Sequence, residues 1–127
     1  MADTINFLLI NGALDQYWAK VLREALGPYG PLSVKLEADS IEPIISGQYQ
    51  LVIVDEAATD NVSLLVARIR AQRPEIGIVV ATASPAWDKA REAFQSGATD
   101  YIRKTFDRSE TASAIRAALL KIQRPKH

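Results

Sequence analysis

Polar residues that could act on one ligand stand directly after apolar segments of this sequence. Asp55 and Thr82 each follow an apolar run of strand length, and Lys104 follows a shorter run. A carboxylate, a hydroxyl and an ammonium group that meet at one point suit an anionic phosphoryl group, either attached to the carboxylate or bound beside it. The first apolar run ends instead in the uncharged pair Asn11 and Gly12. We therefore expect phosphoryl-group chemistry centred on Asp55.

Each of these residues, taken singly, also has an ordinary structural interpretation. Strands commonly end in polar residues, and an Asp–Lys pair at the rim of a sheet is more often a solvated ion pair worth less than ~1 kcal/mol than a reactive centre. The functional interpretation therefore depends on whether the fold brings the ends of the runs together.

The elements that must position these residues follow from the alternation of apolar runs with stretches of helical period, which is typical of an α/β domain with a parallel sheet. Residues 51–54 and 76–81 are apolar without alternation and predict central strands covered on both faces. Residues 32–36 alternate and predict an edge strand with one wet face. With residues 5–10 and 100–103 as the first and fifth strands, the pattern fits a three-layer, flavodoxin-like (βα)5 fold with strand order 2-1-3-4-5. The carboxyl ends of these strands meet at one edge of the sheet.

Capping residues and apolar spacing predict where the helices begin. Ser40 is expected to start a short second helix, and Asp107, followed three residues later by Glu110, is expected to start the last one. Ser84 and Pro85 predict an N-cap and a proline at the first position of the helix after the fourth strand. The apolar stripe of that helix is predicted to be Trp87, Ala90 and Phe94. In the first helix, Trp18 lies at helical spacing with other apolar residues and is expected in the core.

Length and composition exclude several classes of protein. The chain has 127 residues, which suits one domain, and we expect that domain over residues 1–122, with 123–127 as a polar tail or the start of a linker. The formal net charge of zero argues against direct nucleic-acid binding. There is no cysteine for a disulfide or thiolate metal site, and the single histidine is His127. Neither a signal peptide nor a membrane span is predicted, so we expect a cytoplasmic protein with no membrane contact.

The chain resembles a known family along essentially its whole length, and the match is specific in three segments. They are YQLVIVD at 49–55, IVVATA at 78–83 and SGATDYIRK at 96–104. These segments are similar to the phosphoacceptor strand, the switch-threonine strand and the Gly-Ala-x-Asp-Tyr-x-x-Lys segment of the receiver domain of bacterial two-component response regulators. The resemblance implies a receiver fold, a role in phosphorelay signal transduction, and a histidine kinase or phosphotransfer protein as partner.

The same resemblance implies a role for each matching residue. Asp55 would be the phosphoacceptor, Lys104 its counter-cation, and Thr82 the hydroxyl that moves to bond a phosphoryl oxygen. Tyr101 would be the switch aromatic whose rotamer reports the change. A homodimer or an output domain would contact the output face, which runs from the fourth strand to the fifth helix and includes Thr82, Trp87 and Tyr101.

The sequence departs from the family pattern where the metal and the lysine would be placed. The family carries two adjacent acids after the first strand to hold Mg²⁺, and this chain has Asn11 and Gly12 there. Asp55 and the backbone carbonyl of Ala57 would then bind the ion weakly or not at all. The family commonly has a cis-proline after the lysine, whereas this chain has Thr105. A cis bond before a residue other than proline costs about 2.5–4 kcal/mol, so we expect a trans bond.

Three functions remain in view, and the first two are not enzymatic. The chain is a receiver that accepts a phosphoryl group on Asp55, or an atypical pseudo-receiver that signals without phosphorylation. The third, less favoured, is a small ligand-binding or enzymatic flavodoxin-like domain. Residues 11–14 argue against it, because they lack the glycine-rich phosphate loops of nucleotide-binding folds.

Overall fold

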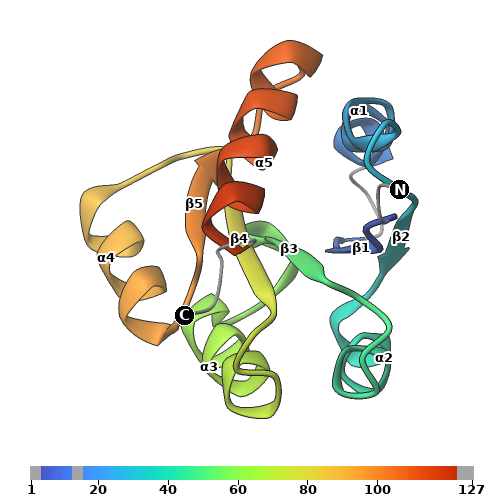
Figure 1. The fold of residues 1–127 in the computed structure, drawn as a ribbon. Helices are drawn as coiled ribbons and strands as arrows, with labels where there is room; N and C mark the ends of the chain where they lie inside the picture. Colours follow the sequence, from blue (N-terminus) through green and yellow to red (C-terminus); the bar gives the residue numbers. More distant parts are fainter. Residues whose placement is uncertain (1–3, 13–15, 123–127) are drawn as a thin grey trace.

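The computed structural model describes residues 4–12 and 16–122, so the predicted tail at 123–127 lies outside the described residues (Figure 1). The strands are β1 (Phe7–Ile10), β2 (Leu32–Lys35), β3 (Leu51–Asp55), β4 (Gly77–Thr82) and β5 (Asp100–Arg103). The helices are α1 (Gln16–Leu26), α2 (Ile41–Ile45), α3 (Val62–Gln72), α4 (Trp87–Ser96) and α5 (Arg108–Ile122). Two short 3-10 turns are η1 (Glu37–Asp39) and η2 (Glu56–Ala58). No helix in these two ranges is long and apolar enough to span a bilayer.

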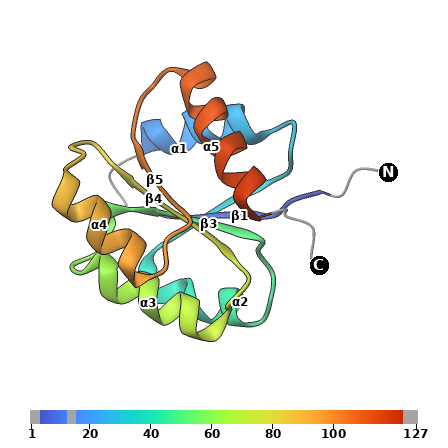
Figure 2. The ribbon, with the colours of Figure 1, turned by 60° about the vertical axis from the view of Figure 1, so that its left-hand side comes forward.

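The strands form one parallel sheet in the order β2-β1-β3-β4-β5, which confirms the predicted flavodoxin-like topology. Helices α1 and α5 cover one face of the sheet and α2, α3 and α4 cover the other (Figure 2). Crossovers between parallel strands are right-handed, so the direction in which the chain moves along the sheet decides which face each connecting helix covers. All strands therefore end at the same edge.

Two apolar clusters hold the layers together, and each takes alternate residues of the central strands. Phe7, Leu9 and Ile53 belong to the cluster under α1 and α5. Leu8 and Val54 belong to the cluster under the other helices. Every residue of β1, β3 and β4 is buried, which confirms the prediction that the two non-alternating runs are central strands. Side chains of successive strand residues point to opposite faces, so a strand covered on both faces needs an uninterrupted apolar run.

Strand β2 lies at the edge as predicted, but the alternation does not mark which side chains are covered. Leu32 is buried, whereas Val34 is 39% exposed and Leu36, just past the strand, is also exposed. Both side chains line an open groove between α1 and β2, together with Ala19 and Lys20 of α1, and are left uncovered there. Ser40 precedes α2 as expected, yet its hydroxyl donates back to the carbonyl of Leu36 (2.7 Å) and does not cap the helix.

The prediction for the start and inner stripe of α4 was wrong. The helix begins at Trp87 after Ala86, which makes no side-chain cap, and Pro85 lies before the helix. Ala93 is the buried residue of α4, while Trp87 is 89% exposed and Phe94 is also exposed. The inner face of α4 therefore carries a small side chain, and neither aromatic ring is in the core.

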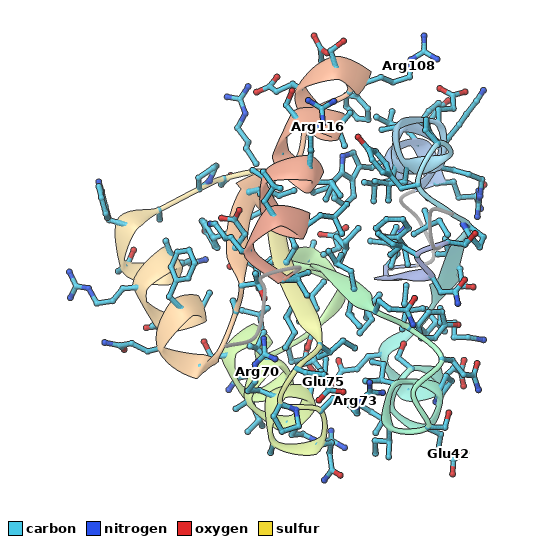
Figure 3. All side chains as sticks on the ribbon, viewed as in Figure 1. Glu42, Arg70, Arg73, Glu75, Arg108 and Arg116 are labelled. Atoms are coloured by element: carbon cyan, nitrogen blue, oxygen red, sulfur yellow. The ribbon has the colours of Figure 1, made fainter. Side chains whose placement is uncertain are left out.

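An arginine fixes the other end of α4. Gly97 ends the helix with φ +118°, a conformation that favours glycine. Its carbonyl accepts bonds from Nε (3.0 Å) and Nη2 (2.8 Å) of Arg70 on α3. Arg70 Nη1 also donates to the carbonyls of Pro74 and Ile76, at 2.9 and 2.6 Å. Burial lowers the pKa of the Arg70 guanidinium below its ordinary value. Figure 3 shows the Arg70 side chain near those of Arg73 and Glu75.

Helix α5 begins where the sequence predicts and is tied to the elements beside it. The Asp107 carboxylate accepts a bond from the backbone N–H of Glu110 (3.0 Å), which caps the helix as expected. Near the exposed end of the helix, Arg108 pairs with Glu24 of α1 at 3.3 Å (Figure 3). The loop between β5 and α5 is thus bounded by a fixed strand and a capped helix.

Candidate functional site

The site is centred on Asp55, the last residue of β3. Its side chain is 2% exposed, and one carboxylate oxygen, Oδ2, lies 2.8 Å from Nζ of Lys104. The other oxygen, Oδ1, accepts a bond from the backbone N–H of Ala57 (3.1 Å) in the turn that follows. Both carboxylate oxygens are therefore bonded within the chain.

Lys104 reaches Asp55 across an intervening strand. Asp55 is paired with Ala81 of β4, and the backbone N–H of Lys104 donates to the carbonyl of Thr82 at 2.8 Å. Neighbouring strands lie about 4.8 Å apart, so the two side chains together span two strand spacings. A long cationic side chain directly after β5 can therefore neutralise a carboxylate at the end of β3.

Thr82 lies one residue beyond the strand partner of Asp55, and its side chain is buried. Its hydroxyl oxygen accepts a bond from the backbone N–H of Ser84 (3.1 Å). The hydroxyl is thereby engaged with the loop that leads to α4. The structure places Thr82 at the same rim as Asp55 and Lys104, as the sequence predicted, and its proposed movement toward a phosphoryl oxygen stays a prediction.

Tyr101 and Trp87 lie on the same face but differ in burial. Tyr101 is partly buried against the cluster under α3 and α4, and its hydroxyl oxygen accepts a bond from the N–H of Ala86 (3.4 Å). Trp87 is exposed, and it lines a shallow hollow together with Pro85, Ala86, Ala90 and Tyr101. Tyr101 therefore links β5 to the loop that follows Thr82.

The end of β1 supplies no charge to the site. Asn11 is buried, and a Cβ added to Gly12 would meet no atom within 4 Å. Among residues 4–12 and 16–122, no three Asp, Glu, His or Cys side chains lie close enough together to hold a metal ion. The Asp55 carboxylate is already paired with Lys104, and Ala57 adds only a backbone carbonyl. A single carboxylate and a backbone carbonyl would hold Mg²⁺ weakly, because this ion is usually bound through one or two carboxylates together with water and phosphate oxygens.

One contact of this site was not predicted from the sequence. The indole N–H of Trp18 on α1 donates to the carbonyl of Thr105 (3.1 Å), and Nζ of Lys104 lies 5.3 Å from the centre of the same ring. Trp18 is 1% exposed, which confirms its predicted place in the core. A buried indole N–H usually finds an acceptor, and that rule was the signal available in the sequence. The Lys104–Thr105 peptide bond is trans, as expected.

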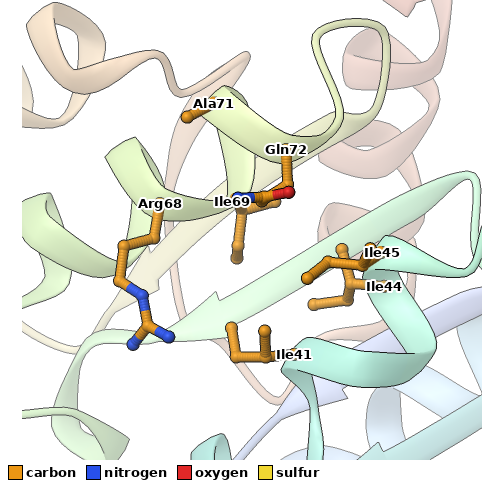
Figure 4. Close-up of a pocket in the computed structure, with 7 residues that line it drawn as sticks. All are labelled: Ile41, Ile44, Ile45, Arg68, Ile69, Ala71 and Gln72. Carbon is orange, nitrogen blue, oxygen red and sulfur yellow. The ribbon is translucent and has the colours of Figure 1, made fainter.

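A separate apolar cavity of about 200 Å³ lies between α2 and α3 (Figure 4). Ile41, Ile44 and Ile45 line it from α2, and Arg68 and Ile69 are among the residues that line it from α3. None of the residues around Asp55 contributes to it, so we do not assign it to the site.

Two curated proteins are similar to part of this sequence, and no family model matches it. Both are described as the DNA-binding transcriptional regulator NtrC. The protein from Azospirillum brasilense is 35% identical over 77 residues, which are 60% of this chain and 16% of that protein. The protein from Rhizobium meliloti (strain 1021) is 34% identical over 82 residues, which are 64% of this chain and 17% of that protein. The chain thus matches only a small part of each regulator.

Solved structures resemble the whole fold. HP1043, an orphan response regulator of H. pylori, has a TM-score of 0.80 and 23% identity, covering 94% of this chain and 99% of that one. A response regulator from Thermotoga maritima has a TM-score of 0.79 and 21% identity, covering 93% and 99%. The signal receiver domain of the putative response regulator NarL from Mycobacterium tuberculosis has a TM-score of 0.77 and 15% identity, covering 96% and 99%. The chain has the receiver-domain fold of response regulators.

Proposed function

We propose that this chain is an atypical receiver domain of two-component signalling that works without Mg²⁺-dependent phosphorylation of Asp55. One observation carries the proposal. Asn11 and Gly12, which follow β1, carry no charge, while the Asp55 carboxylate is already neutralised by Lys104 at 2.8 Å. At this site the charge of Lys104 is used to neutralise Asp55, whereas phosphoryl transfer would require additional positive charge to neutralise the incoming phosphoryl group.

The physical argument concerns charge on the transferred group. Phosphoryl transfer to a carboxylate brings two anions together, and metal ions neutralise much of the charge that develops between them. Lys104 alone would have to leave Asp55 partly uncompensated in order to bond the incoming oxygens. We therefore expect transfer to be slower by orders of magnitude than at a site with a bound divalent cation.

A second candidate function is that of a working receiver, and the positions of three side chains favour it. Asp55, Lys104 and Thr82 lie at one rim of the sheet, as the acceptor, counter-cation and switch hydroxyl would require. In this candidate a histidine kinase or phosphotransfer protein donates the phosphoryl group, and Tyr101 transmits the change to the output face.

Both candidates use the output face, where Trp87 lies over the hollow beside Tyr101. A homodimer or an output domain would cover this exposed aromatic side chain. We propose no direct contact with nucleic acid, because the formal net charge is zero. The DNA binding named for the NtrC proteins is not transferred to this chain, which matches 16% and 17% of their lengths.

Intact-mass analysis after incubation with acetyl phosphate and millimolar Mg²⁺ tests the choice between the two candidates. We expect the wild-type mass to stay unchanged and the fluorescence of the exposed Trp87 to show no response to beryllofluoride. A phosphoryl adduct that maps to Asp55 and is absent from Asp55→Asn would overturn the proposal in favour of the working receiver.

A further inference from the structure

We infer that Trp18 is a positioning residue that directs Lys104 toward Asp55. The inference rests on the proposed function in one respect, since it takes the Asp55–Lys104 pair as the centre of the site. It is specific to this chain, because Lys104 is followed by Thr105 and the peptide bond between these two residues is trans.

Two contacts from one side chain carry the inference. The indole N–H donates to the carbonyl of Thr105 at 3.1 Å, which fixes the backbone just after Lys104. The ring of Trp18 lies beneath the Lys104 ammonium, with Nζ 5.3 Å from its centre. A cation at this distance from an indole ring is attracted by the electrons of the ring face. The ammonium thus lies between a carboxylate and an aromatic ring.

The tryptophan can act in this way because its own position is fixed. It is 1% exposed and belongs to the cluster that joins α1 to α5, with Leu22, Ile115 and Leu119 among its members. Its ring is therefore part of the packed layer above the sheet. Interiors are packed as densely as organic crystals, so a side chain in such a layer holds one orientation.

Other features of the β5–α5 loop do not replace this contact. The Thr105 carbonyl also accepts a bond from the Thr111 hydroxyl, at the longer distance of 3.3 Å. Phe106, the next residue, is exposed and gives the loop no anchor in the core. Threonine leaves φ free, whereas a proline ring would fix it. Trp18 therefore supplies a restraint that the sequence of the loop does not provide.

A purely structural role for Trp18 makes a different prediction. If the indole only fills the core, its replacement lowers stability but leaves the environment of Lys104 as it was. If it positions Lys104, loss of the indole N–H changes the exposure of that amine in particular. The reactivity of the single amine at Lys104 distinguishes the two roles.

The test is site-resolved amine labelling read by mass spectrometry on the full chain. Trp18→Phe keeps a ring and removes the N–H, Trp18→Leu removes both contacts, and Trp87→Phe is the matched control at an exposed tryptophan. We expect Lys104 labelling to rise about two- to tenfold in Trp18→Phe, the range that one ordinary hydrogen bond supports, and further in Trp18→Leu. Labelling of Lys20 and Lys121 should stay constant in every variant. Unchanged Lys104 labelling in folded Trp18 variants would overturn the inference.

A second measurement leaves Trp18 in place, in case its variants do not fold. The chain has two tryptophans, so its amide spectrum contains two indole N–H resonances. Lys104→Met removes the cation beside one ring, and we expect the Trp18 resonance to shift while that of Trp87 stays in place. An unshifted Trp18 resonance would contradict the inference.

These outcomes are separate from those that test the proposed function. Lys104 labelling and the indole resonances are measured without phosphate. A phosphoryl adduct on Asp55 would therefore overturn the proposed function and leave the role of Trp18 standing. Constant Lys104 labelling in the Trp18 variants, together with an unmodified Asp55, would overturn the role of Trp18 and leave the proposed function standing.

Discussion

The ammonium of Lys104, the residue after β5, lies 2.8 Å from the carboxylate of Asp55 at the end of β3, and strand β4 lies between these two strands. Both side chains are largely buried, with exposed fractions of 14% for Lys104 and 2% for Asp55. An ion pair in this environment behaves differently from one on the surface. Removal of one partner leaves a buried charge that neither water nor another ion compensates.

The two halves of this pair are therefore not equivalent in their effect on stability. We expect Lys104→Met to lower the free energy of unfolding by about 3 kcal/mol or more, because the Asp55 carboxylate would stay buried without a counter-charge. Asp55→Asn removes the carboxylate from the better hydrated Lys104, which keeps its contact with the Trp18 ring, and we expect a smaller loss, about 1–2 kcal/mol. Urea unfolding of both variants measures the difference. Losses below ~1 kcal/mol in both variants would show that the pair is effectively solvated.

Placing two acids directly after β1 should create or strengthen a response of the chain to Mg²⁺. We expect the double variant Asn11→Asp, Gly12→Asp to gain thermal stability in millimolar Mg²⁺, because a ligand that binds only the folded state stabilises it by mass action. Space is available, since a Cβ at Gly12 would meet no atom within 4 Å.

The matched control for this experiment is Gly12→Asn, which adds a side chain of similar size without the charge. Its melting temperature should not depend on Mg²⁺. If the double variant also fails to respond, the geometry of the loops around Asp55 prevents metal binding, and the missing acids are not the cause.

The sequence was sufficient to predict the sheet and the residues at its rim. Apolar runs such as residues 51–54 identify central strands, and in a parallel sheet the next residue of every strand lies at one edge. That rule placed Asp55, Thr82 and Lys104 at one rim before any coordinates were known. Which oxygen Lys104 contacts, and what fixes its direction, depends on packing.

The predictions that were wrong or incomplete concern contacts and turns that residue types and spacing do not determine. The contact between Trp18 and Thr105 joins residues 87 positions apart, so no local pattern encodes it. The start of α4 was misplaced for a local reason: the Thr82 hydroxyl oxygen accepts a bond from the N–H of Ser84, two residues further on, and the helix begins only at Trp87. A turn held by a side-chain hydroxyl is an alternative to helix for the backbone, and here it stands where the sequence predicted the cap.

Gly97 provides a test of how α4 is held. Alanine at this position would keep φ near +118° and place its Cβ 2.9 Å from Cγ of Arg70. We expect Gly97→Ala to lower the free energy of unfolding by about 1–3 kcal/mol through strained backbone and displaced Arg70 bonds. Gly27→Ala is the control, because its nearest contact, at 3.5 Å to the Arg23 carbonyl, is ordinary. Equal losses in the two variants would argue that Arg70 does not hold the end of α4.

Trp87 tests the proposed output face. A tryptophan that is 89% exposed contributes little to folding, so we expect Trp87→Ser to change the free energy of unfolding by no more than ~0.5 kcal/mol. If a second copy covers this side chain, the same change should weaken self-association at least tenfold, since an aromatic anchor at an interface commonly contributes ~2 kcal/mol. Sedimentation equilibrium over a range of concentrations measures the self-association of the wild type and of Trp87→Ser. The control is Tyr17→Ser, because Tyr17 on α1 is also strongly exposed. A wild-type chain that stays monomeric would contradict the homodimer, and equal weakening by Tyr17→Ser would place the contact on another face.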